Sequence, residues 1–504
     1  MATLHIHSIY ELRNTVNPVA GDIYYSNDLG QEGEWYYDSN DTTSPYNTGI
    51  ILEGQSGVRF KRIYNGFVNV KWFGAKGDAW PGNDSITNDT VAIQLALDTM
   101  ILLISGINSP HAQNQTVSEM SGALYFPAGY YQIETVEIRA TDFVSEQYRL
   151  RIIGAGIKST IFVHLSQYIP APPGAEASAS IPINVVPLFL HFQSYITIED
   201  LSIIGNFISE GIYSIQNTDV GGPYYYVGAG YECIGINAQD NVACSYRKLY
   251  IACCEVCFKS YGCLIYNISE CTFGNDDGRG DYSGSEGHIT YSPEFASNYG
   301  LSIKARYGGD AANLINISNC RIVRCRIWGL EYGDQIEGAA GDLLNITGSE
   351  FEANGSQDLN GVGDPETGGI IIWGYSVNPL NDGTPLQVNI YNSHFERNYG
   401  YFFKYDGLGN RIFNILGSLF SGADQNKRYF GILIDTHPGQ NTTYVEVKIV
   451  NIMGCNSNIS ALHSGGGTYD TFIINCEEAN LIGSYLQYLS VYPASTITQL
   501  VNKL

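Results

Sequence analysis

A seven-residue motif recurs five times in the second half of the chain, and it restricts the fold more than any other feature of the sequence. The motif reads Asn-Ile-x-x-(Cys/Ser)-x-(Phe/Ile) and begins at Asn267, Asn316, Asn345, Asn389 and Asn414. A second unit, a glycine followed by alternating apolar residues, falls between the copies. Alternation with a period of two is typical of strands, and strand units that recur and interleave indicate a solenoid.

The spacing of the motif indicates the architecture. Successive copies begin 49, 29, 44 and 25 residues apart, so short coils set the basic period and longer coils carry loops on the outside. A β-propeller would need regular four-stranded blades, and that period is absent. The sequence therefore predicts a parallel β-helix, with the first unit on one sheet and the second unit on the next.

The charge of the chain restricts its partners. The 504 residues include 26 Lys and Arg against 50 Asp and Glu, a net charge of −24. Nucleic acid binding needs a basic stripe, and none is visible, so we expect no nucleic acid partner. The same negative charge mildly disfavours a strongly anionic polymer as the substrate. The 38 tyrosines offer flat amphipathic surface suited to sugar rings, although tyrosine is also a common strand residue.

The cysteines and the N-terminus bear on the compartment. Seven of the 11 cysteines lie between Cys233 and Cys271, and Cys254-x-x-Cys257 lacks a second pair or histidine ligands. We therefore expect buried thiols stacked in the coils, no metal there, and synthesis in a reducing compartment. Residues 1–20 have no apolar core of signal-peptide length, and no apolar run of about 18 residues exists, so we expect no membrane insertion.

The stretch Val68–Met100 combines an apolar run, a polar loop and an amphipathic helix predicted over residues 89–104, with Asn88 or Asp89 as N-cap. Phe73–Asp78, FGAKGD, and Thr90–Ala96, TVAIQLA, resemble the opening signature of the pectate-lyase-like superfamily of right-handed parallel β-helices. In that family the helix covers the first coil and stops the open end of the stack from pairing with another chain.

Residues 1–66 are similar to the small β-rich module that often precedes this signature in phage tailspikes and bacterial β-helix proteins. We expect an all-β protein: a cap module over residues 1–66, a right-handed single-stranded parallel β-helix over 67–490, and a C-terminal end segment over 491–504. The resemblance to tailspike depolymerases implies a polysaccharide substrate, a homotrimer by analogy, and a place on a virion tail or extracellular surface.

Candidate catalytic residues follow from the alternation of side chains along each strand. If Ile, Cys/Ser and Phe of the motif point inward, one outward row reads Thr272, Arg321, Glu350, His394, Leu419 and the next reads Gly274, Val323, Glu352, Glu396, Ser421. Neighbouring coils stack about 4.8 Å apart, close to the roughly 5 Å between the carboxyl groups of a retaining glycosidase. Two like charges this close favour one acid and one base.

We take Glu352 and Glu396 as the catalytic pair, with Glu350, His394 and Arg321 as tuning or binding groups. The alternative is an exposed charge ladder that Arg321, Arg324 and Arg397 partly neutralise. Long segments at 274–299 and 354–368 flank a short coil, which predicts a groove with two walls. On the second sheet, residues suited to a sugar platform and its polar contacts are Trp328, Trp373, Lys304, Arg306, Glu331 and Asp334.

These features favour a polysaccharide depolymerase, most simply an endo-acting glycoside hydrolase that needs no cofactor. A β-eliminating lyase on the same fold is a second reading, in which Asp276, Asp277 and Asp281 would bind Ca²⁺ and a basic residue would abstract a proton. A carbohydrate-binding adhesin without catalysis is a third, because it would keep an aromatic groove and tolerate loss of both glutamates.

Overall fold

The computed structural model describes residues 4–80, 83, 85–105, 121–138, 149–163, 189–192, 196–205, 213–217, 222–226, 234–239, 241, 243–262, 264–274, 297–304, 312–333, 341–355, 366–374, 386–407, 411–422, 430–435, 449–459, 472–474, 478–482, 484, 489–491 and 496–500. The chain divides into two compact units, residues 1–165 with 194–202, and residues 166–193 with 203–504. Among the described residues, no helix has both the length and the apolar character to span a membrane.

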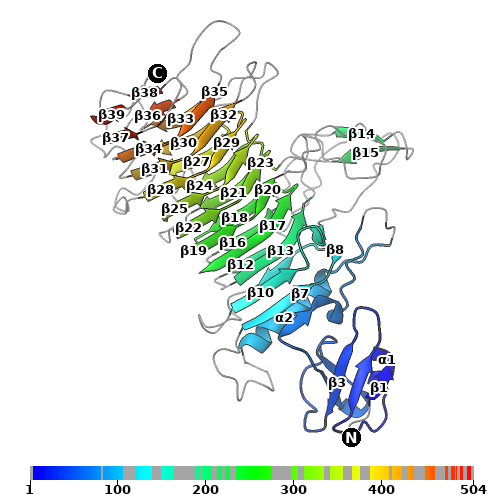
Figure 1. Ribbon diagram of the computed structural model, residues 1–504. Coiled ribbons are helices and arrows are strands. Elements are labelled where there is room, and N and C mark those ends of the chain that lie inside the picture. The colour runs from blue at the N-terminus through cyan, green and yellow to red at the C-terminus, as the bar shows by residue number, and fades with distance from the viewer. Residues whose placement is uncertain are drawn as a thin grey trace. The chain divides into compact units, whose positions relative to one another are not determined.

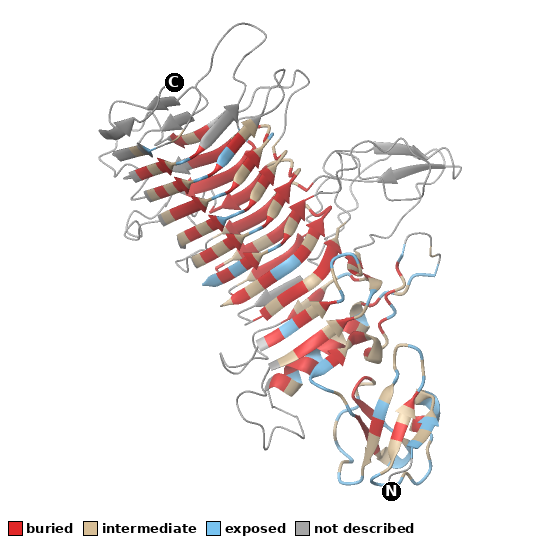
Figure 2. Ribbon diagram, in the orientation of Figure 1, coloured by how far each residue is buried: buried red, intermediate tan, exposed pale blue. Residues whose placement is uncertain are grey.

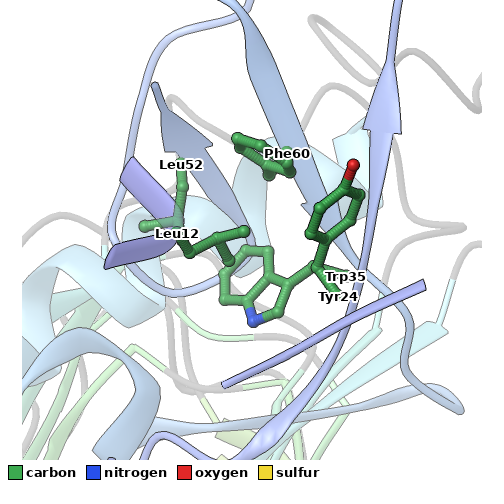
Figure 3. Packing of buried hydrophobic residues seen from close by; sticks show 5 residues of the cluster. All are labelled: Leu12, Tyr24, Trp35, Leu52 and Phe60. Carbon is green, nitrogen blue, oxygen red and sulfur yellow. The ribbon is translucent and has the colours of Figure 1, made fainter. Parts of the chain in front are cut away.

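The first unit opens with a small five-stranded sheet. Its strands, in spatial order, are β1 (Leu4–His7), β2 (Ile23–Ser26), β3 (Gly33–Asp38), β5 (Arg59–Arg62) and β4 (Ile51–Glu53). Helix α1 (Ile9–Arg13) begins at Ser8 with a capping box and lays Leu12 on one face of the sheet. Figure 3 shows this core, formed by Leu12, Tyr24, Trp35, Leu52 and Phe60.

The capping helix is α2 (Thr90–Ser105), within one residue of its expected position. Its apolar stripe is buried over the first coil, at Ile93, Ala96, Leu97, Met100, Ile101 and Ile104. Asp89 holds the N-cap position, since its carbonyl accepts the first helical bond from Ile93. Its carboxylate instead accepts the backbone N–H groups of Lys76 (2.6 Å) and Gly77 (3.0 Å). Burial raises the pKa of Asp89 to about 6.

The first unit continues into parallel coils beneath this helix. β6 (Phe67–Asn69), β7 (Ser121–Phe126), β10 (Arg149–Gly154) and β13 (Ile196–Ile204) pair in parallel, in that order. β8 (Gly129–Gln132) pairs in parallel with β11 (Thr160–Val163) beside them. Residues that follow the FGAKGD signature therefore begin a β-helix, as the sequence predicts.

The second unit consists of three stacks of parallel strands (Figure 1), whose register is given by paired residues. Stack 1 contains β17 (Cys244–Ala252), β19 (Ile265–Ser269), β22 (Ala312–Ser318), β25 (Gly341–Thr347), β28 (Leu386–Tyr391), β31 (Arg411–Leu416), β34 (Ile449–Met453), β37 (Glu478–Ile482) and β39 (Thr496–Leu500). Stack 2 contains β20 (Thr272–Gly274), β23 (Arg321–Val323), β26 (Glu350–Glu352), β29 (His394–Glu396), β32 (Leu419–Gly422) and β35 (Asn456–Ile459).

Stack 3 contains β12 (Phe189–Phe192), β16 (Ile234–Gln239), β18 (Val256–Tyr261), β21 (Tyr299–Lys304), β24 (Trp328–Tyr332), β27 (Gly368–Gly374), β30 (Tyr401–Gly407), β33 (Phe430–Asp435), β36 (Phe472–Ile474) and β38 (Leu489–Val491). The parallel β-helix is thus confirmed. Each coil has three strands where the motif predicts two, because the motif bends at its fourth residue. Asn319, Gly348, Asn392 and Gly417 hold that position with φ of 48–62°, which asparagine and glycine tolerate.

Apolar side chains fill the interior of the stacked coils, and the strands that Figure 2 colours by burial in stacks 1 to 3 are mostly red, which marks buried residues. The aromatic residues of the motif form a column, with ring centroids 5.1 Å apart for Phe351 and Phe395 and 5.0 Å for Phe395 and Phe420. Eight cysteines among the described residues are free and buried, and the Cys271 thiol contacts that of Cys320 one coil on. The expectation of buried, stacked thiols is confirmed for these.

Two ladders of asparagine side chains run along the coils. The outer ladder lies on the outward face of stack 1, where each amide donates to the amide oxygen of the coil before it, from Asn316 to Asn267 at 3.0 Å through to Asn451 to Asn414. The inner ladder joins Asn354 and Asn398, which are fully buried at the turn after stack 2. Such ladders satisfy backbone and amide groups where parallel coils turn.

Candidate active site on stack 2

The register of stack 2 confirms the two predicted outward rows. Arg321 pairs with Glu350, and Glu350 pairs with His394. Val323 pairs with Glu352, and Glu352 pairs with Glu396. The four candidate catalytic residues therefore lie on two adjacent strands, β26 and β29, with Arg321 on β23 one coil earlier.

Arg321 joins the two glutamates of β26. Its Nε donates to Oε2 of Glu350 at 2.7 Å, and its terminal nitrogen donates to Oε2 of Glu352 at 3.2 Å. One guanidinium thereby holds two carboxylates on the same strand. Arginine suits this arrangement because its donors form a planar fork.

Arg397 joins the two glutamates of the proposed pair across the coils. A terminal nitrogen of Arg397 donates to Oε1 of Glu352, and its Nε lies 3.0 Å from Oε1 of Glu396. His394 completes the cluster, with Nδ1 3.8 Å from Oε1 of Glu350 and Nε2 3.8 Å from Oε2 of Glu396. The six side chains form a closed ring in which carboxylates alternate with basic groups. We call it the Glu/Arg/His ring.

The ring is open to solvent on its outward side. The exposed fraction of the side chain is 18% for Glu352 and 27% for Glu396. Both arginines are more than a third exposed, so the ion pairs are worth little stability in water. A site with two half-buried carboxylates one coil apart can perform general acid-base or nucleophilic chemistry on a bound saccharide.

Arg397 lies one residue past the strand, outside the alternating rows, so the alternation rule does not find it. It has φ of 53°, in the left-handed region that disfavours residues with a Cβ. Asn398 fixes this turn from beneath: its amide donates to the carbonyl of Phe351 at 2.8 Å. Arg324 and Ala353 follow the paired residues Val323 and Glu352 and have φ of 53° and 57°, so this left-handed turn is a repeated feature of the coils.

Glu350, His394 and Glu396 also have the geometry of a metal site. One ligand atom from each lies within 4.8 Å of the others. However, Glu350 already contacts Arg321, and Glu396 contacts Arg397. A cation bound here would have to displace or sit beside two guanidinium groups, which disfavours it by like-charge repulsion.

The candidates on stack 3 lie in a separate, packed patch. Glu331 is 7% exposed and accepts from the Ser302 hydroxyl (2.7 Å) and the Trp373 indole (3.3 Å), with Lys304 Nζ at 3.3 Å. Trp328 is 2% exposed and packs with Trp373. These groups are brought together, but as a buried cluster of tryptophans and ion pairs.

Other expected features fall outside the described residues. These are Arg306, Asp334, the carboxylates Asp276, Asp277 and Asp281, and most of the two long segments expected to wall a groove. Burial raises the pKa of Tyr299, on β21, to about 12, with Glu331 and Glu255 contributing. This tyrosine therefore stays neutral at physiological pH beside the stack 3 patch.

Comparison with known families adds to this geometry. Residues 5–65 match a family described as a phage tail protein small four-stranded beta-sheet domain. Residues 67–171 match the family of rhamnogalacturonase A/epimerase, pectate lyase-like. The chain therefore opens with a segment similar to this phage tail domain, followed by one similar to the pectate-lyase-like family, which confirms the resemblance seen in its sequence. No curated protein matches the chain.

Several solved structures are similar to this chain at low sequence identity. ORF18 of Geobacillus virus E2 is 16% identical over 99% of this chain and 74% of its own, with a TM-score of 0.44. Tailspike gp49 of Acinetobacter baumannii bacteriophage Fri1, a capsular polysaccharide depolymerase, is 9% identical over 100% and 77%, with a TM-score of 0.49. The enzymatically active domain of bacteriophage CBA120 tailspike protein 2 is 11% identical; this chain spans 98% of its own length and 56% of that one (TM-score 0.44).

Proposed function

We propose that the protein is a polysaccharide depolymerase of a phage tail, an endo-acting glycoside hydrolase that cleaves a bacterial surface polysaccharide. The observation that carries this proposal is the pairing of Glu352 with Glu396 on adjacent coils, open to solvent and joined by Arg397. The coil repeat of about 4.8 Å approximates the roughly 5–5.5 Å of a retaining mechanism. The phage tail match over residues 5–65 supports the location.

The contacts of the two glutamates favour different roles. Both oxygens of Glu352 meet guanidinium groups, one from Arg321 and one from Arg397, which suits the nucleophile. Glu396 contacts one guanidinium and turns Oε2 toward His394, which suits the general acid and base. In this scheme Glu352 attacks the anomeric carbon while Glu396 protonates the leaving oxygen, and water then releases the sugar from Glu352.

The proposal includes no cofactor and a homotrimeric assembly. Hydrolysis by two carboxylates needs no metal, so activity should survive a chelator. Loss of activity in chelator, restored by Ca²⁺, would contradict this part of the proposal. The homotrimer is proposed by analogy with phage tailspikes, and its test is the molar mass of the protein in solution.

The test is digestion of a panel of bacterial surface polysaccharides with wild type, Glu352→Gln and Glu396→Gln. Reducing ends and near-ultraviolet absorbance are measured together. A matched control is Glu270→Gln, which removes an exposed carboxylate at a neighbouring turn of the same β-helix, 3.9 Å from Lys248. We expect new reducing ends without absorbance, a loss of at least about 100-fold in both variants, and no loss in the control.

Three other outcomes would contradict the proposal. Absorbance from unsaturated products would establish a lyase. Binding without cleavage by wild type would establish an adhesin. Full activity in both glutamine variants would move the active site away from stack 2.

A further inference from the structure

His394 has a hydrogen-bond partner outside the Glu/Arg/His ring. Its Nε2 lies 3.1 Å from the hydroxyl oxygen of Ser421, which is within hydrogen-bond distance. The carboxylates on either side are farther away, with Nδ1 3.8 Å from Oε1 of Glu350 and Nε2 3.8 Å from Oε2 of Glu396. Among these described neighbours, Ser421 therefore holds the imidazole more directly than either glutamate does.

Ser421 is placed for this contact by the register of stack 2. On β32 the buried Phe420 separates two outward residues, Leu419 and Ser421. Leu419 pairs with His394, and Ser421 pairs with Glu396. The hydroxyl thus reaches diagonally back by one coil, from the row of Glu396 to the row of His394, and meets the imidazole at the nitrogen that faces Glu396.

Other serines nearby bond to the backbone of their own coil. The hydroxyls of Ser349, Ser393 and Ser418 each donate to the carbonyl two residues earlier in the chain, at 3.1–3.4 Å. These three lie at the buried Cys/Ser position of the motif. Ser421 is instead half-buried on the outward face, and its hydroxyl bonds to a side chain of the neighbouring coil. Its contact therefore fixes a side chain rather than the winding of the coil.

A hydroxyl suits a histidine that changes its protonation state. It accepts a hydrogen bond from Nε2–H when that nitrogen is protonated, and it donates one to Nε2 when that nitrogen carries no proton. An ionised carboxylate can only accept, so it favours the charged imidazole and is itself favoured in its ionised form. The hydroxyl of Ser421 can therefore keep the ring of His394 in one place in both protonation states.

We propose that Ser421 is a positioning residue, which holds His394 at equal distances from Glu350 and Glu396 and keeps the imidazole from bonding to Glu396. This inference rests on the proposed function, in which Glu396 must give up and regain a proton. An imidazolium bonded directly to Glu396 would hold that carboxylate ionised and unable to protonate the leaving oxygen.

The charges around the imidazole indicate which bond would form without the hydroxyl. Glu350 places its other oxygen, Oε2, on Arg321, and Glu396 places Oε1 near Arg397. The oxygen of Glu396 that faces Nε2 is Oε2, at 3.8 Å. Once Ser421 no longer holds Nε2, a small rotation of the ring would bring the imidazole into a direct ion pair with Glu396.

The backbone of Ser421 has a separate role that a side-chain substitution leaves intact. Its carbonyl accepts the N–H of Arg397 at 2.9 Å, and the same bond joins Ala353 to the carbonyl of Glu396 one coil earlier. This bond therefore belongs to the coil repeat and does not need a hydroxyl. Ser421→Ala should remove the contact with His394 and leave the turn in place, which circular dichroism and the melting temperature verify.

The first test does not depend on cleavage. Full-length wild type, Ser421→Ala, Ser421→Thr and Ser318→Ala are treated with diethyl pyrocarbonate, which reacts with neutral imidazoles, and labelled peptides are measured by mass spectrometry. Ser318 is a half-buried outward serine of stack 1 and provides the matched control. The chain has nine histidines, and those other than His394 are internal references.

We expect labelling of His394 to be at least about threefold slower in Ser421→Ala, because an ion pair with Glu396 favours the charged imidazole. Labelling of His394 in Ser421→Thr and Ser318→Ala should equal that in wild type, since both variants keep a hydroxyl beside the imidazole.

The second test is the pH dependence of kcat and KM on a polysaccharide that wild type cleaves. In Ser421→Ala we expect kcat to fall at least about threefold with KM unchanged. The loss should be greatest at the alkaline end of the profile, where the general acid is hardest to keep protonated. Ser421→Thr retains the hydroxyl and should retain the wild-type profile.

Three results would overturn the inference. The first is labelling of His394 in Ser421→Ala that is unchanged or faster. The second is a kcat that is unchanged or falls equally at every pH. The third is a Ser421→Thr variant that behaves like Ser421→Ala. If wild type cleaves no polysaccharide, the proposed function fails, and the labelling rate of His394 still decides whether Ser421 keeps the imidazole from Glu396.

Discussion

Replacement of Asn398 by alanine should destabilise the turn that carries Arg397. The Oδ1 of Asn398 accepts from the backbone N–H of Asn354 (3.0 Å) and from its side-chain amide (2.9 Å), and its own amide donates to Phe351 at 2.8 Å. Both asparagines are fully buried. The substitution therefore removes the partner of one buried backbone N–H and a donor from one buried carbonyl.

Each buried polar group left without a partner costs about 1–3 kcal/mol, so two such groups cost about 2–6 kcal/mol. The matched control is Asn414→Ala in the outer ladder. Asn414 makes similar side-chain bonds but is only half-buried, so water can replace them. We expect the control to lose less than about 1 kcal/mol.

The assay combines the guanidinium unfolding midpoint, at fixed protein concentration, with hydrogen exchange in peptides that span 350–355 and 394–399. Asn398→Ala should lower the midpoint and speed exchange in both peptides. It should also reduce depolymerase activity, because Arg397 lies in the same turn and its position depends on that turn. If the unfolding midpoint of Asn398→Ala falls no further than that of Asn414→Ala, burial does not determine how much stability the lost hydrogen bonds cost, and the reasoning is refuted.

Three further predictions concern other positions. The folded-state pKa of Asp89, about 6, lies above the ordinary aspartate pKa of 3.8. The contribution of this group to the free energy of unfolding should therefore fall by about 3 kcal/mol as pH rises from 3.8 to 6. A plot of melting temperature against pH should lose this part of its slope in Asp89→Asn. Arg397→Gly allows the φ of 53° without strain but removes the guanidinium group. Activity should therefore drop at least about tenfold at an unchanged melting temperature. Activity equal to that of wild type would contradict a role of Arg397 in the active site. Gly274→Ala puts a Cβ 1.9 Å from the Val323 carbonyl oxygen and should lower the free energy of unfolding by more than about 1 kcal/mol. Gly57→Ala has φ of 78° but open space around the new Cβ, so it should lower the free energy of unfolding less than Gly274→Ala does. The denaturant unfolding midpoints of the two variants test this difference.

The repeat made the outward rows of stack 2 predictable because side chains alternate strictly along a strand. Glu352 beside Glu396 follows from the motif alone. The third strand of each coil cannot be predicted from the motif, because it depends on a bend in the backbone at residues such as Asn319. A short sequence motif cannot reveal that bend without the conformation of the residue itself.

Side-chain partners were less accessible to prediction than register. Arg397 reaches from the end of β29 to Glu352 on the neighbouring strand because its side chain is long, and no rule of alternation describes that reach. Trp328 and Trp373 stand on the outward face of stack 3 yet are buried. Outward direction therefore does not guarantee contact with solvent, because other parts of a large solenoid can cover a sheet face.

The Glu/Arg/His ring also has a consequence for folding. Its members come from three successive coils: Arg321 lies 31 residues before Glu352, and Glu352 lies 45 residues before Arg397. A solenoid folds by adding neighbouring coils, and a slip of one residue in a single strand would turn its glutamate inward. The ring can therefore close only on a correctly wound stack, so activity and complete winding of this part of the chain should be acquired together.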